Sequence, residues 1–532
     1  MEELLKDSIG TIAILIYILY PMLKRWLDRR KQKKQRQQTT PSGPDPTPVP
    51  SPPEPVVPPP VSVPEPVSPP PSADRERRLM VEEQARRVRA RATRLLDTAK
   101  KNPRLVRLVP ALRNDVLSQV ASIEDDLRSS PSIDDLADDA RALGGLAELL
   151  GYLEKMAQQR LRSPAAAIGD ADRMADACYA PFIEFARSHG LELSTSTPMV
   201  VSGDWQLAIV PRFADTGLAP IRVPRGFAQS IWLWPALAHE VAHDLYYSVG
   251  GLEHELHARL GLPHRVYAPQ TEYEVNAQLV HDLYGAWLSE IFPDLIGTLT
   301  LGPAYVETMR RAFRDRQSPH RTAAIIEERG EIEEHPPARL RVYMATRVLH
   351  RLGRHEEADD LWNQWQADHD GIDLYFLPLS GRWVGIAEEP MHEAADAIID
   401  VLLEESWPEL ADYRLLNIPG FAYSHAAHAE VESFKRQLKR GGKVTGDVRW
   451  IMAAAVLAVT EDPTLHDQVL DAAQRAILGV GGRPILDELP TEAKAGGSIG
   501  SMVLASLRSR AAVREAIILG EAISPYRRPG PR

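Results

Sequence analysis

The proline-rich segment at residues 41–71 most strongly limits how this chain of 532 residues can fold. It consists of Pro, Val, Ser and Glu with little else, so it cannot bury an apolar core, and proline favours an extended polyproline II conformation. At about 3.1 Å per residue, a rod of this length would reach roughly 100 Å. We therefore predict a stalk that tethers a folded body to the N-terminal segment. A ligand for an SH3-type domain is the alternative.

An apolar run at residues 9–23 precedes this segment, and basic residues are dense over residues 24–36. A secretory signal peptide carries its positive charge before the apolar run, whereas here the positive charge follows it. Such charge keeps its side of the membrane in the cytoplasm. We predict a single-pass transmembrane anchor at residues 1–27 and a basic juxtamembrane and proline-rich linker at residues 28–73, with the soluble domains facing the cytoplasm. A helix that lies on the membrane surface is the alternative.

The remainder of the chain is rich in Ala, Leu, Arg, Asp and Glu, which is typical of helical proteins. Short strands are predicted at residues 198–201, 206–210 and 220–223, and a strand or hairpin at residues 373–384. These patterns indicate a predominantly α, α+β fold with a small β-sheet flanked by helical regions. The expected domains are an N-terminal helical region at residues 74–165, a central domain at residues 166–370 and a C-terminal helical domain at residues 371–532.

Charge and cysteine content narrow the class of protein further. The formal net charge is −11, opposite in sign to the charge that nucleic-acid binding requires, so no nucleic-acid partner is expected. Cys178 is the only cysteine, which excludes an internal disulfide framework and suits a reducing compartment.

The most informative local pattern is His239-Glu240-Val241-Ala242-His243. Residues four apart lie one turn apart on the same face of a helix, so the two imidazoles can bind one metal ion. Glu240 lies beside them, where its carboxylate can reach a water molecule on that ion. The spacing therefore predicts a helix that carries two metal ligands and a general base.

A third protein ligand is expected, because catalytic zinc usually has three. The metzincin continuation is absent, since Tyr246 and Val249 stand where that pattern needs Gly and His. A later glutamate is the other common solution, and the candidates are Glu253, Glu255, Glu272, Glu274 and Glu290. Glu290 is favoured because Asp294 follows one turn later and can orient a ligating histidine. The first two candidates follow Gly250-Gly251 too closely, and neither of the next two has an aspartate four residues on.

The motif HExxH followed by ExxxD resembles the gluzincin family of zinc metallopeptidases. His335-Pro336-Pro337, with Arg339 and Arg341, is similar to the His-Pro loop of M48-type membrane-associated peptidases. This resemblance covers about residues 195–350 and implies a zincin-like metallopeptidase core within residues 166–370. It also implies that an edge strand of the small sheet just before the HExxH helix pairs with the substrate backbone. It also implies that His239, His243 and Glu290 bind Zn²⁺ while Glu240 acts as general base. Pro293 departs from the pattern, because it removes a hydrogen bond where the ligand-bearing helix should be regular.

The predicted function is that of a membrane-tethered zinc metallopeptidase that hydrolyses peptide bonds with zinc-activated water. The oxyanion would be stabilised by His335, Tyr305 or Arg341, of which His335 is the residue we assign. The expected partners are a peptide or protein substrate, the membrane and a protein bound by the C-terminal helical domain. The alternative is a catalytically silent membrane-anchored scaffold with a structural or vestigial zinc site. His254 and His257 are expected to be exposed polar residues near a helix start.

Overall fold

The computed structural model describes residues 71–129, 133–162, 165–191, 197–203, 208–209, 218–314, 319–369, 371–379 and 382–479. The predicted transmembrane anchor, most of the linker and the C-terminal tail lie outside these residues. Within the described part, no helix combines the length and apolarity needed to cross a membrane. The chain forms two compact units, Met1–Ala157 and Gln158–Arg532.

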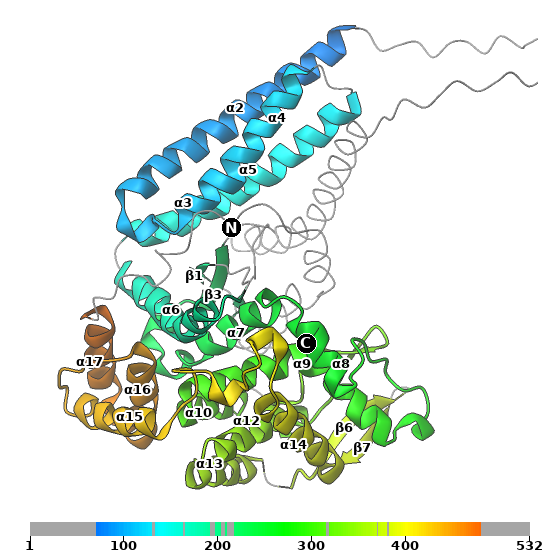
Figure 1. The fold of residues 1–532 in the computed structure, drawn as a ribbon, viewed down its shortest axis with the longest axis vertical. Coiled ribbons are helices and arrows are strands. Elements are labelled where there is room, and N and C mark those ends of the chain that lie inside the picture. The colour runs from blue at the N-terminus through cyan, green and yellow to red at the C-terminus, as the bar shows by residue number, and fades with distance from the viewer. Residues whose placement is uncertain are drawn as a thin grey trace, which may run out of the picture. The chain divides into compact units, whose positions relative to one another are not determined.

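The first unit is a helical bundle (Figure 1). Its helices are α2 (Pro71–Lys101), η1 (Pro103–Leu105), α3 (Leu108–Pro110), the π-helical η2 (Ala111–Leu117), α4 (Ser118–Arg128) and α5 (Ile133–Leu161), of which the residues up to Ala157 belong to this unit. Small and branched residues at helical spacing, such as Ala85, Val88 and Ala92, are buried between them. The arginine-rich stretch of α2 pairs with neighbouring helices, since Arg89 and Arg91 each form a two-pronged ion pair with a glutamate.

The second unit contains a three-stranded sheet and most of the helices. Its strands are β1 (Thr197–Gly203), β2 (Ala208–Ile209) and β3 (Leu218–Pro224), in the order β1-β3-β2. β1 pairs parallel to β3 and β2 pairs antiparallel to it. The three predicted strands are therefore found. The strand that directly precedes the HExxH segment is not an edge strand as expected, because β3 pairs with β1 and β2 on its two sides and is the central strand.

The helices of the second unit are α6 (Ala165–Ser188), α7 (Ala236–Ser248), α8 (Leu252–Leu260), α9 (Ala277–Leu301), α10 (Pro303–Arg314), α11 (Pro319–Thr322), α12 (Ala338–Arg351), α13 (His355–Asp368), α14 (Glu388–Glu404), α15 (His425–Leu438), α16 (Val448–Glu461) and α17 (His466–Gly479). The 3₁₀ turns in the described part of this unit are η4 (Phe227–Gln229), η5 (Ile231–Leu233), η6 (Glu272–Glu274), η7 (Pro408–Leu410), η8 (Leu415–Asn417) and η9 (Pro463–Leu465). Two antiparallel hairpins complete the unit, β4 (Glu327–Glu328) with β5 (Glu331–Ile332) and β6 (Leu374–Leu379) with β7 (Arg382–Ala387), the latter as predicted. The described part of the chain is thus predominantly α-helical with small sheets.

Helix α9 lies in the core of the second unit. It packs against α7, α10, α12, α14 and α16, and every residue from Glu290 to Leu301 is buried. Helix α16 also contacts α6 and α10, so helices beyond residue 388 share this core. A helix that is buried all round must supply partners for any charge that it carries. Glu290 and Asp294 are two such charges, and their partners form the site described next.

Candidate metal centre

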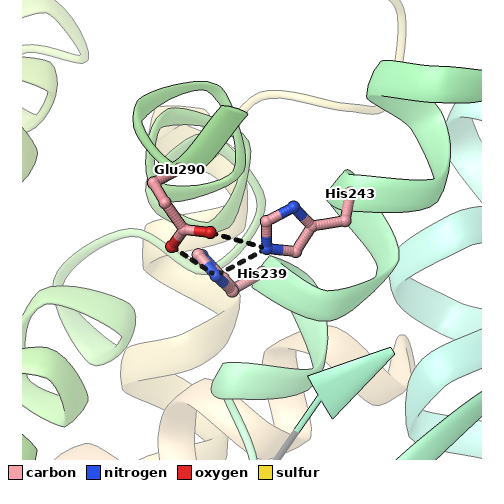
Figure 2. Close-up of side chains that lie close together, drawn as sticks. All are labelled: His239, His243 and Glu290. Carbon is pink, nitrogen blue, oxygen red and sulfur yellow. Dashed lines mark hydrogen bonds and ion pairs between the residues drawn. The ribbon is translucent and has the colours of Figure 1, made fainter. Parts of the chain in front are cut away.

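Helix α7 presents His239 and His243 on one buried face. Their exposed fractions are 5% and 3%, and that of Glu240 is 1%. The helix is held in place by apolar residues around these side chains, among them Val241 and Leu245. The two imidazoles point toward the side chain of Glu290 on α9, as Figure 2 shows. The sequence segment with the metal-ligand spacing therefore forms a helix within the core.

The three predicted ligands converge on one point. Nε2 of His239 lies 3.0 Å from Nε2 of His243, and each of these nitrogens lies 3.5 Å from an oxygen of Glu290 (Figure 2). A tetrahedral ion with bonds of about 2.0–2.1 Å holds its ligand atoms about 3.3–3.4 Å apart. The three side chains therefore form a group with the chemistry and the spacing to hold a metal ion.

Asp294 fixes the orientation of the His239 ring. Its Oδ1 lies 2.9 Å from Nδ1 of His239, and an ionised carboxylate can only accept, so Nδ1 donates the hydrogen bond. Once the ring has lost its second proton, Nε2 has a lone pair directed at the cluster, which is the usual arrangement for a metal-bound histidine. Pro293 does not end the helix, because α9 continues to Leu301 and both acids reach α7.

Arg341 of α12 and Tyr305 of α10 brace the two carboxylates. Arg341 donates to both oxygens of Asp294, at 2.6 and 2.9 Å, and its Nη2 lies 3.3 Å from Oε2 of Glu290. The Tyr305 hydroxyl donates to Oδ1 of Asp294 at 2.7 Å. The tyrosine ring fits there because residue 297 is glycine, whose Cβ, if present, would lie 2.5 Å from the ring. Tyr305 and Arg341, the alternative candidates for the oxyanion donor, contact these carboxylates.

The electrostatics of the centre favour positive charge at His239. Burial alone would lower its pKa, but Asp294 and Glu290 outweigh burial and raise the pKa to about 10. Burial lowers the pKa of His243 to about 3. Burial would raise the pKa of Asp294, yet Arg341 and His239 hold it at about 2. Without a metal the centre therefore holds one proton between two carboxylates, and a metal cation can take its place.

His335 lies at the rim of the centre. Its Nε2 is 3.9 Å from Oε1 of Glu290, and its Nδ1 is 2.6 Å from Oε1 of Glu333. The backbone oxygen of Glu333 accepts a hydrogen bond from Trp287 on α9, so this loop is anchored to the ligand-bearing helix. Glu333 was not among the site residues predicted from the sequence. The available signal was a carboxylate two residues before the histidine of the His-Pro-Pro turn.

The other candidate third ligands lie elsewhere. Glu255 pairs with Arg259, Glu272 with Arg382, and Glu274 accepts from Thr271. The remaining one, Glu253, belongs to a second cluster with two histidines.

One of those histidines corrects an expectation. His254 is exposed as predicted, but His257 is buried, because its side chain faces the turn that follows α8.

Comparison of the chain with protein-family models, with curated proteins and with solved structures found no match.

Proposed function

We propose that the chain is a zinc-dependent metallopeptidase of the gluzincin type. The observation that carries this proposal is the convergence of His239, His243 and Glu290 beside Glu240, with His239 oriented by Asp294. Two imidazoles and one carboxylate are the donor set that catalytic zinc accepts in peptidases with an HExxH helix. The proposed core is zincin-like, with α7 and α9 as its ligand-bearing helices.

When bound, Zn²⁺ supplies a Lewis acid that polarises the scissile carbonyl and makes a water molecule more acidic. Glu240 immediately follows the ligand His239 on α7. Its carboxylate accepts the proton of the attacking water. A carbon–oxygen bond forms and the carbon–nitrogen bond breaks. Glu240 then returns the proton to the leaving amine, so the carboxylate ends in its starting state.

His335 is assigned to the developing oxyanion. A carboxylate at Nδ1, here that of Glu333, stabilises the protonated imidazole and orients its Nε2 toward Glu290. Nε2–H then donates to the carbonyl oxygen as negative charge develops on it. Glu333 is a positioning residue in this scheme, because it acts through His335.

The substrate backbone is assigned to the sheet. Helix α7 packs on β2 and β3, and β2 pairs on one side only within the described residues. An extended peptide can add to such a strand through backbone hydrogen bonds. The edge that we propose for substrate is therefore that of β2, in place of the strand immediately before α7.

The setting of the enzyme is part of the proposal. The apolar run followed by basic residues supports a membrane anchor with the soluble units in the cytoplasm. The stalk would then hold the peptidase away from the membrane, and the C-terminal helices would contact a protein partner.

Two substitutions test the proposal. Glu240→Gln should abolish hydrolysis of a casein or peptide-library substrate while one zinc per centre stays bound, because only the base is lost. Glu290→Ala should lower metal content as well. Glu255→Gln, which alters a surface ion pair on α8, is the control and should leave both measurements unchanged.

Hydrolysis by Glu240→Gln at the wild-type rate would refute the mechanism. Zinc bound normally by Glu290→Ala would refute the ligand assignment. Wild-type protein that binds no metal at this centre would favour the catalytically silent scaffold.

A further inference from the structure

A second group of metal-ligating side chains lies at the end of α8. Glu253 and His257 are one turn apart on this helix, and His264 belongs to the segment that follows it. The candidate ligand atoms of these three residues all lie within 4.8 Å of one another. The rings of the two histidines are 3.9 Å apart between centroids. None of the three belongs to the centre around Glu290.

The end of α8 explains how this group is assembled. Gly261 has φ of 64°, the left-handed conformation that glycine favours at a helix end. The amides of Gly261 and Leu262 then bond back to Ala258 and His257, at 3.2 and 2.9 Å. This turn reverses the chain and returns His264 over His257, so local sequence positions the third ligand.

The tautomer of His257 suits metal binding. Its Nδ1 lies 3.3 Å from the backbone oxygen of Leu262, and a carbonyl only accepts, so Nδ1 carries the hydrogen. Nε2 therefore has its lone pair available, and the hydrogen bond at Nδ1 is the support that ligating histidines usually have.

We propose that Glu253, His257 and His264 bind a second divalent metal ion, of the zinc class, with a structural role. Two imidazoles and a carboxylate suit zinc in preference to calcium or magnesium. The 4.8 Å limit is wider than the separation of about 3.3 Å in a tetrahedral site. His264 is exposed, so its side chain is the one that moves inward when the ion binds.

The ion would fasten a segment that leads to the first centre. After His264, the backbone oxygen of Val266 accepts from Ile332 at 2.8 Å, and Ala268 donates to Gly330 at 2.9 Å. Ile332 ends strand β5 and immediately precedes Glu333. The second ion therefore supports the wall of the centre that carries Glu333 and His335, without contacting its ligands.

The test uses the full chain, stripped with a chelator and reloaded with Zn²⁺ alone. Metal per chain is counted after gel filtration for wild type, His264→Asn and His254→Asn. His264 is exposed, so its replacement should leave folding intact. His254 is the matched control, since it is an exposed histidine on α8 whose ring lies 6.3 Å from that of His264.

We expect His264→Asn to bind one zinc fewer than wild type and His254→Asn to bind the same number as wild type. Zinc should also slow amide hydrogen exchange over residues 262–268 in wild type but not in His264→Asn. Equal zinc content in wild type and His264→Asn would overturn the proposal, as would equal loss in both variants. If wild type binds one zinc and His264→Asn none, this site is supported and the centre at Glu290 is the empty one.

Discussion

Replacement of Asp294 with Asn should lower the number of protons that the metal centre releases when it binds a metal ion. The amide keeps the shape of the carboxylate but removes its charge from between His239 and Arg341. In the wild type, Asp294 accepts from Nδ1 of His239 at 2.9 Å and helps to raise the pKa of His239 to about 10. A metal ion that binds below that pH must displace the proton.

The pKa of His239 determines how strongly metal affinity depends on pH and in which direction. Between pH 7 and a pKa of about 10, proton competition weakens apparent affinity by about 10³-fold, or about 4 kcal/mol. Wild-type affinity should therefore rise about tenfold per pH unit over this range and level off above it. Without the Asp294 charge the pKa of His239 falls, so the affinity of the variant should level off at a lower pH than that of the wild type. At the alkaline end the variant should bind about 10–100-fold more weakly, the usual cost of losing an orienting partner.

Calorimetric titration with Zn²⁺ at pH 8, in two buffers of different ionisation enthalpy, measures the protons released. The His257 site should contribute equally in both proteins. We expect the wild type to release more protons per metal than Asp294→Asn. Asp282→Asn is the matched control, because Asp282 lies on the same helix, partly exposed, and accepts from Gln278. Equal proton release and equal pH slopes in wild type and Asp294→Asn would refute this account of the centre.

Three further predictions address packing, positioning and the metal itself. Gly297→Ala places a methyl group 2.5 Å from the Tyr305 ring and should cost about 1–3 kcal/mol in urea unfolding. Gly169→Ala, where a Cβ meets nothing within 4 Å, should not lower stability, and equal effects would contradict the packing argument. His335→Ala should lower kcat by about 10²–10³-fold. Glu333→Gln should lower kcat by a smaller factor and leave KM nearly unchanged. If kcat is unchanged in both variants, His335 has no part in the mechanism. Chelation should abolish hydrolysis and lower the melting temperature, and added Zn²⁺ should restore both. The reason is that an ion present at a free concentration of 1,000 times its Kd stabilises the native state by about 4 kcal/mol.

The sequence predicted those features that depend on local spacing. His239 and His243 share a helix face because four residues make about one turn, and Glu290 and Asp294 do so for the same reason. The three strands and the hairpin at residues 373–384 were predicted from short β-rich runs bounded by turn residues. In each case the decisive interactions lie within a few residues along the chain. The predicted membrane anchor and stalk lie outside the described residues and stay predictions.

Tertiary structure decided which of these faces meet. Five glutamates were candidates for the third ligand, and only the packing of α9 on α7 brings Glu290 to the two histidines. Packing of α10 and α12 against α9 likewise turned Tyr305 and Arg341 toward carboxylates.

Two further features differ from what the local patterns predicted. Strand β3 became central because β1 and β2 pair on its two sides, and His257 became buried because the turn at Gly261 folds back over it. Helical and strand periodicity are properties of a few consecutive residues, and the sequence alone determines them. The partners of a buried charge are chosen by contacts between distant segments, so only the assembled core determines where a proton or a metal ion is held.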